Sequence, residues 1–105
     1  MSNPALIVLV RFRSSLSHEQ ATKILEARAH EFRALAGLQQ KYYLQDPATG
    51  EYAGLYLWQS TDDFAAFRDS ELRASIAEAY QVEGEPRIEV YRVFKTLRDG
   101  AANAD

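Results

Sequence analysis

The 105-residue sequence contains no cysteine. Disulfide bonds, thiolate nucleophiles, cysteine zinc sites and iron–sulfur clusters are therefore excluded. No apolar run approaches the roughly 20 residues that a membrane-spanning helix needs. Residues 1–4 lack the basic start of a signal peptide, and the apolar stretch 5–10 is short and followed by Arg11. We therefore expect a cytoplasmic protein with no membrane partner.

Recognised sites for charged ligands are also lacking. The net charge is −3 and no basic stripe occurs, so nucleic acid is not expected as a partner. Histidines and carboxylates do not fall at metal-ligand spacing, and neither a glycine-rich phosphate loop nor a serine–histidine constellation is visible. We expect no metal and no other cofactor.

What remains is ordinary globular composition, with 47% hydrophobic and 26% charged residues. The length fits one domain, which we place at residues 1–98, with a disordered tail at 99–105. Ser17 and Gln20 form a capping box, which predicts a helix from there to Gly37. A second helix is predicted from about residue 62, with a break near Ser70. Strands are predicted at residues 5–13, 38–45, 53–60 and 87–97.

The order strand, helix, strand, strand, helix, strand predicts an α+β, ferredoxin-like βαββαβ fold. Both helices then cover one face of a four-stranded antiparallel sheet. The strand at 53–60 is apolar on both faces, with Tyr56 and Trp58 on one and Leu55 and Leu57 on the other. Predicted residues of the uncovered face are Ile7, Leu9, Tyr43, Leu55, Leu57, Tyr91 and Val93. Such a patch exceeds what a monomer usually exposes, so we expect a homodimer through the sheet, a dimeric α+β barrel.

The sequence resembles a known family in Gly37-Leu38, Lys41, the turn after Asp46 and, above all, residues 53–58. It is similar to the small monooxygenases of the YdhR type, in the dimeric α+β barrel group of the antibiotic biosynthesis monooxygenases. The resemblance covers residues 5–97 and implies the fold and an oxygenase-like activity. The same fold also hosts isomerising, decarboxylating and haem-degrading enzymes, and proteins with no known reaction.

The resemblance also implies roles for individual residues. Trp58 and Arg73 match a tryptophan and an arginine of the cofactor-independent, quinone-forming members. Gly54 and Phe64 stand where those members carry asparagine and tyrosine. The asparagine, tryptophan and histidine of the haem-degrading members have no counterparts at the corresponding positions, which argues against a haem monooxygenase.

Gly54 predicts a substrate pocket between the sheet and the helices. It removes a side chain from the face that carries Tyr56 and Trp58, and so leaves a hollow beside two large rings. Aromatic walls suit a flat apolar substrate. Further candidate substrate-binding residues are Phe32, Phe64 and Phe67. The alternative is that these rings are simply hydrophobic core.

Arg28 is the candidate catalytic charge. It falls within the apolar arc of the first helix, where an unpaired guanidinium is costly. Its partner is either a protein carboxylate or an anionic oxygen on a ligand; otherwise the side chain extends to solvent. Arg73 and Arg92 are further candidates of this kind, whereas His18 and His30 are expected at the surface.

These observations lead to a small homodimeric, cofactor-independent monooxygenase-like protein that acts on an aromatic or conjugated small molecule. Arg28 or Arg73 would stabilise a carbanion or phenolate, and the aromatic residues would exclude water. One alternative is a non-catalytic ligand-binding or interaction module of the same fold. Another is an isomerase or lyase.

Overall fold

The computed structural model describes residues 3–98. Its elements are β1 (Leu6–Ser14), α1 (His18–Arg33), β2 (Leu38–Gln45), β3 (Tyr52–Trp58), α2 (Thr61–Arg68), α3 (Glu71–Ala74), α4 (Ile76–Ala79) and β4 (Val82–Arg92). The strands form one antiparallel sheet in the order β2-β3-β1-β4. The predicted ferredoxin-like α+β fold is therefore confirmed. The predicted tail, 99–105, lies outside the described residues.

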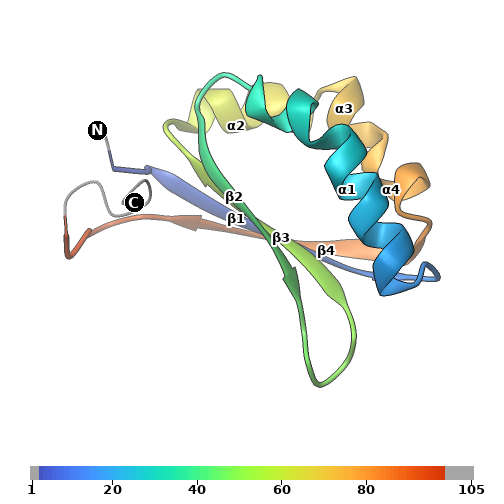
Figure 1. The fold of residues 1–105 in the computed structure, drawn as a ribbon. Helices are drawn as coiled ribbons and strands as arrows, with labels where there is room; N and C mark the ends of the chain where they lie inside the picture. Colours follow the sequence, from blue (N-terminus) through green and yellow to red (C-terminus); the bar gives the residue numbers. More distant parts are fainter. Residues whose placement is uncertain (1–2, 99–105) are drawn as a thin grey trace.

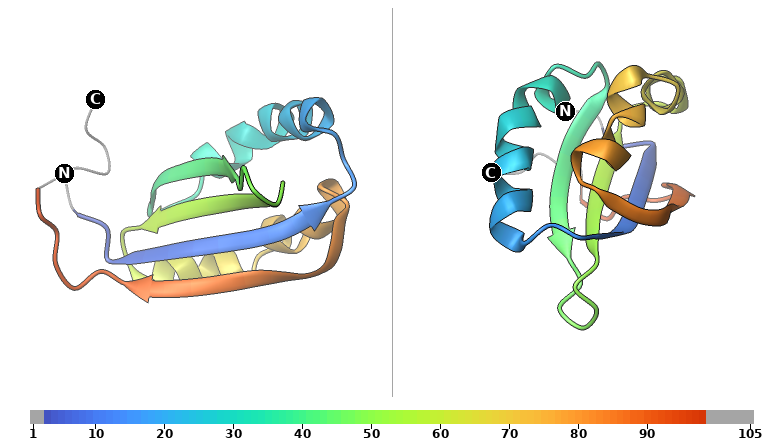
Figure 2. Two further views of the ribbon diagram at one scale, coloured as in Figure 1. Left: turned by 90° about the horizontal axis from the view of Figure 1, so that it is seen from below. Right: turned by 90° about the vertical axis from the view of Figure 1, so that its right-hand side faces the viewer.

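The helices all lie on one side of the sheet (Figure 1). Seen from below, the strands stand in front of the helices, so no helix of residues 3–98 lies on the second face (Figure 2). None of the described helices combines the length and the apolar character that crossing a membrane requires.

Local sequence signals explain where α1 begins and ends. The Ser17 hydroxyl accepts a hydrogen bond from the Gln20 backbone N–H at 3.1 Å, and the Gln20 side chain accepts one from the Ser17 N–H at 2.9 Å. The predicted capping box is therefore present. Gly37 adopts φ +77°, and a Cβ there would overlap Asp63 of α2. Only glycine fits this turn into β2 without strain.

The second helical region is broken where the sequence predicted it. The Ser60 hydroxyl caps α2 by accepting from the Asp63 N–H at 3.1 Å. Helix α2 then ends at Arg68, and the Ser70 hydroxyl accepts from the Arg73 N–H at 3.2 Å to start α3. Because serine competes for backbone hydrogen bonds, it ends one helix and caps the next.

The last strand was predicted at 87–97, and this placement was wrong: β4 runs from Val82 to Arg92. It includes Pro86, which lacks a backbone N–H. A sheet tolerates proline at its edge, and β4 is the edge strand beside β1. Val93 lies beyond this strand, where its N–H donates to the Ala5 carbonyl at 2.9 Å.

Strand pairing defines the two faces of the sheet. Ile7 is opposite Leu57 and Tyr91, and Leu9 is opposite Leu55, so this apolar outer row lies where it was predicted. The helix-facing side carries the core, whose buried members are Leu6, Val8, Phe32, Tyr56, Trp58, Phe64 and Phe67.

Tyr43 is the exception, because the prediction that placed it on the outer face was wrong. The pairing of β2 with β3 shifts between Leu38 and Gln40, which is a β-bulge. One extra residue reverses the alternation that follows it. Tyr43 is therefore paired with Gly54 and, with Lys41, turns toward the helices.

Candidate functional site

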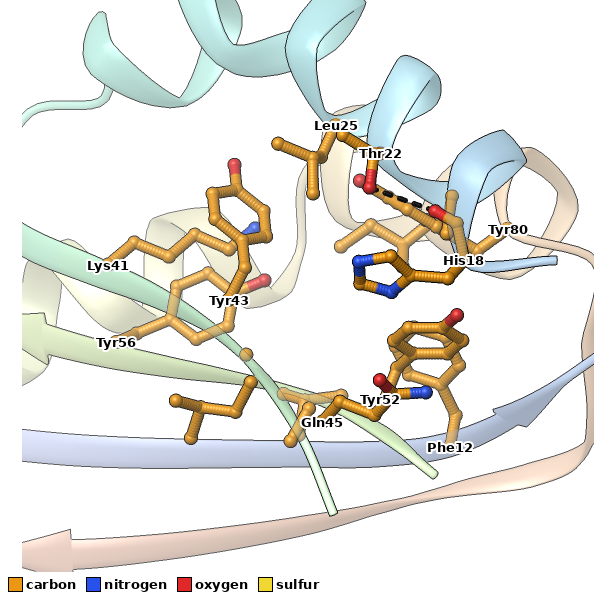
Figure 3. A pocket seen from close by; sticks show the side chains of 16 residues that line it. Phe12, His18, Thr22, Leu25, Lys41, Tyr43, Gln45, Tyr52, Tyr56 and Tyr80 are labelled. Carbon is orange, nitrogen blue, oxygen red and sulfur yellow. Dashed lines mark hydrogen bonds between the residues drawn. The ribbon is translucent and has the colours of Figure 1, made fainter. Parts of the chain in front are cut away.

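A cavity of about 340 Å³ lies between α1, the β2–β3 hairpin and the start of α4. We call it the tyrosine cavity, because four phenol rings line it. Figure 3 shows these rings and their neighbours around the opening. Its principal lining residues are Phe12, His18, Leu25, Lys41, Tyr43, Tyr52, Gly54, Tyr56, Ile76 and Tyr80.

Gly54 lies in the wall of this cavity, where the sequence predicted a hollow. A Cβ at this position would lie 3.0 Å from Cε1 of Tyr56 and 3.4 Å from Cε of Lys41. Contacts this short require the ring or the lysine chain to move. The missing side chain therefore makes room for both Tyr56 and Lys41.

Three tyrosines of this cavity, Tyr43, Tyr56 and Tyr80, have raised pKa values. Burial raises the pKa of Tyr80 to about 12, and burial also raises the pKa of Tyr56 and of Tyr43. The Tyr80 hydroxyl is buried and has no hydrogen-bond partner among residues 3–98. At neutral pH these groups can donate hydrogen bonds to a ligand oxygen.

Lys41 is the functional candidate that the sequence analysis missed. Its Nζ lies 3.6 Å from the centre of the Phe32 ring, 4.4 Å from that of Tyr43 and 4.6 Å from that of Tyr56. Burial, and then the charge of Arg28, lower the pKa of Lys41 to about 7. The sequence named Lys41 only as part of the family resemblance and not as a site residue, and the bulge that turns it inward is not visible in the sequence.

Arg28 lies on α1 above this group, as its place on the helical arc predicted. Its guanidinium donates to the Ser75 hydroxyl at 2.7 Å, which ties α1 to the start of α4. Its Nε is buried without a hydrogen-bond partner, and it forms no ion pair with any carboxylate of residues 3–98. Arg28 therefore adds positive charge beside the cavity that no described acid neutralises.

A second cavity of about 220 Å³ lies between β1, β4 and the helices α2 to α4. We call it the phenylalanine cavity, because Phe64 and Phe67 line it together with Arg73. Val10, Phe12, Tyr56 and Ile76 line both cavities, so the two are adjacent. The predicted residues Phe64, Phe67 and Arg73 thus belong to this neighbouring space.

Trp58 is sealed in the core. It is 0% exposed, lines neither cavity and stacks on Tyr56 with 6.3 Å between ring centres and 3° between planes. Phe67 lies 5.4 Å from both rings, and Phe32 lies 6.2 Å from Phe67. The structure therefore brings the predicted aromatic residues together as one cluster, of which Trp58 is the innermost.

The remaining polar candidates lie at the surface. His30 and Arg92 are exposed. His18 is exposed as predicted, but it also stacks on Tyr52 at the rim of the tyrosine cavity, with 6.3 Å between ring centres. In the part of the chain that the structure describes, no three histidine or acidic side chains gather as they would around a metal ion.

Comparison with solved structures identifies the fold. SnoaB, a cofactor-independent oxygenase from Streptomyces nogalater, superposes with a TM-score of 0.71 at 14% identity, over 91% of this chain and 99% of SnoaB. A protein from Deinococcus radiodurans described as a candidate antibiotic biosynthesis monooxygenase gives 0.68 at 14%, over 89% and 96%. A dimeric ferredoxin-like protein of unknown function from Thermobifida fusca gives 0.65 at 16%, over 89% and 95%.

The chain thus shares the ferredoxin-like fold of these three proteins. No protein-family model matches the sequence, and no curated protein matches it. The narrower resemblance to the YdhR type stays a prediction.

We expect Lys41→Met to stabilise the protein most at low pH. The pKa of Lys41 is about 7 in the folded protein, whereas an unfolded chain has the ordinary lysine value of about 10. Between these two pH values the unfolded chain therefore binds more protons than the folded protein. The charged Lys41 therefore destabilises the fold fully below about pH 7, and this cost disappears as the pH rises toward 10. Methionine keeps an unbranched chain against the rings.

Urea unfolding across this range provides the measurement. The stability gap between Lys41→Met and the unmodified protein should shrink with pH by at most about 1.4 kcal/mol per unit. Lys23→Met is the matched control, because the Lys23 side chain is 74% exposed on α1 and should give no such trend. A gap that stays constant or widens with pH would contradict the account of Lys41.

Proposed function

We propose that this protein is a cofactor-independent, monooxygenase-like enzyme that acts on a small aromatic or conjugated molecule in the tyrosine cavity. The observation that carries the proposal is the composition of the cavity wall. Four phenol rings and Phe12 face a space of about 340 Å³, which is within the range of small-molecule sites. The fold shared with SnoaB supports it.

The charges near the cavity suit chemistry in which the substrate supplies the electrons. Neither aspartate nor glutamate is among the described lining residues, whereas Lys41 lines the cavity and Arg28 lies within electrostatic range of it. Cations held in a water-poor site stabilise a phenolate or carbanion. Oxidation of a substrate CH₂ to C=O by O₂ balances with water as the second product, and it needs no external reductant.

Oxygen uptake tests this function. Polyphenols and hydroquinones are added to the protein in an oxygen electrode, and at least one should be consumed with O₂ in proportion to enzyme. Gly54→Ala should reduce the rate by roughly tenfold or more, because its Cβ pushes Tyr56 and Lys41 into the cavity. Ala27→Ser is the control, since Ala27 is exposed on α1 and does not line the cavity.

The same assay separates the alternatives. Ligand binding without oxygen uptake would favour a non-catalytic binding module, and substrate conversion without oxygen uptake would favour an isomerase or lyase. No binding and no turnover across the panel would contradict the proposal.

A homodimer through the outer sheet face belongs to this proposal. Tyr91 is 55% exposed, Tyr42 45% and Leu44 42% on this face, and Phe94 beyond β4 is 96% exposed. Burial of such apolar surface is worth about 25 cal/mol per Å², and a twofold interface presents the same row from both copies. The fold neighbour from Thermobifida fusca is itself described as dimeric.

Sedimentation tests this interface. The unmodified protein should sediment as a dimer at micromolar concentration. Leu55→Glu should dissociate it, because Leu55 lies on the outer face opposite Leu9 and Tyr42, and a carboxylate buried there has no partner. Ala27→Glu, on the exposed side of α1, should remain dimeric. A monomeric unmodified protein, or a Leu55→Glu dimer of unchanged strength, would rule out this interface.

A further inference from the structure

The surroundings of Lys41 point to a role beyond that of a countercharge in the proposed oxygen chemistry. Its ammonium group lies over three aromatic rings, 3.6 Å from the nearest ring centre. Its Nζ forms no ion pair with a carboxylate of residues 3–98, and it lies over the rings of Phe32, Tyr43 and Tyr56. Ring faces attract a cation electrostatically. Unlike a carboxylate, they do not accept a strong hydrogen bond from its N–H groups. The donors of Lys41 are therefore free for a ligand.

The charged and titratable groups around Lys41 come from every neighbouring element. Helix α1 contributes Arg28 and Arg33, strand β2 contributes Tyr43, strand β3 contributes Tyr56, and Tyr80 follows α4. His18 lies at the opposite end of the cavity from Lys41 (Figure 3). This set contains cations and neutral phenols, and none of the described residues that line the cavity is acidic.

Two consequences follow for a proton. Burial and Arg28 hold the pKa of Lys41 at about 7, so a large fraction of the molecules carry a neutral amine at neutral pH. The phenols of Tyr56 and Tyr80 have raised pKa values, so they do not release protons to that amine. A proton that reaches Lys41 must therefore come from solvent or from a ligand.

We propose that the tyrosine cavity binds a phenol or an enol, and that Lys41 accepts its acidic proton and holds the ligand as the oxyanion. The ligand O–H bond breaks, an N–H bond forms on Nζ, and no electron leaves the ligand. The resulting ammonium and the Arg28 guanidinium are the countercharges, and the protonated tyrosines can donate to the anion. This inference rests on the tyrosine cavity as the site of the proposed function, and it does not depend on oxygen chemistry.

Binding of 3-nitrophenol tests the proposal, because the anion of this probe absorbs at visible wavelengths and its pKa in water lies above that of Lys41. Titrations are carried out at a pH between the two values, where the free probe is mostly neutral. The unmodified protein should bind it with the spectrum of the anion. Affinity should change little over this interval and fall roughly tenfold per pH unit below about pH 7, where a proton must be released on binding.

Two variants test whether Lys41 is the group that takes up the proton of the ligand. Lys41→Met should bind the probe at least about tenfold more weakly and without the anion spectrum, whereas the matched control Lys23→Met should behave like the unmodified protein. Lys41→Arg keeps the charge but accepts no proton. Binding of the anion then releases a proton throughout the interval, so the affinity of this variant should decrease roughly tenfold for each unit by which the pH is lowered. Circular dichroism establishes that each variant is folded.

Several results would overturn the assignment. For the unmodified protein, these results are binding of the neutral phenol or no binding at all. For the variants, they are an anion spectrum that persists in folded Lys41→Met, or an anion spectrum that is lost in His18→Gln and not in Lys41→Met. The outcome is distinguishable from that of the proposed function. Anion binding without oxygen uptake from any substrate supports Lys41 as the proton acceptor and contradicts the oxygenase function. Oxygen uptake without an anion spectrum supports the oxygenase function and contradicts Lys41 as the proton acceptor.

Discussion

The strand β3 needs apolar cover on both faces of the sheet, and the other layers follow from this constraint. It is an interior strand between β2 and β1. Tyr56 and Trp58 stack beneath the helices on one side. Leu55 and Leu57 lie on the other side, opposite Leu9 and Ile7 of β1. Helices α1 to α4 cover the first face, and a second copy of the chain is the proposed cover for the other. The aromatic stack, together with Leu6 and Val8 of β1, forms the surface on which the helices pack.

Two local irregularities convert this packing into a cavity. Gly54 leaves out one side chain from the helix-facing row, beside the ring of Tyr56. The bulge in β2 then turns Lys41 and Tyr43 toward the space that Gly54 leaves. A regular sheet would have placed both residues on the outer face. The cation and the phenol therefore reach the cavity because the pairing of β2 with β3 shifts once, and such bulges are common near functional sites.

The sequence predicted those features that depend on local signals. The capping box at Ser17, the break at Ser70 and the two apolar faces of β3 each involve residues close together in the chain, and the hollow at Gly54 follows from one missing side chain. The misassigned features depend on contacts between distant segments. The face of Tyr43 is set by the register of β2 against β3, and the start of β4 before Pro86 depends on its edge position. Lys41 was not predicted as a cavity residue for the same reason, because its face depends on that register. The hydrogen-bond partner of Arg28 was not predicted either, because Ser75 is 47 residues away in the sequence.

The central claim is that small aromatic ligands bind in the tyrosine cavity, and the six tyrosines of the chain allow a direct test. Tyr43, Tyr52, Tyr56 and Tyr80 line the cavity, whereas Tyr42 and Tyr91 lie on the outer sheet face. Nuclear magnetic resonance spectra of the protein with ¹³C-labelled tyrosine rings should be recorded during titration with a phenolic ligand. The account predicts that the signals of the four cavity tyrosines shift while those of Tyr42 and Tyr91 stay in place. Shifts confined to Tyr42 and Tyr91, or no shifts at all, would contradict it.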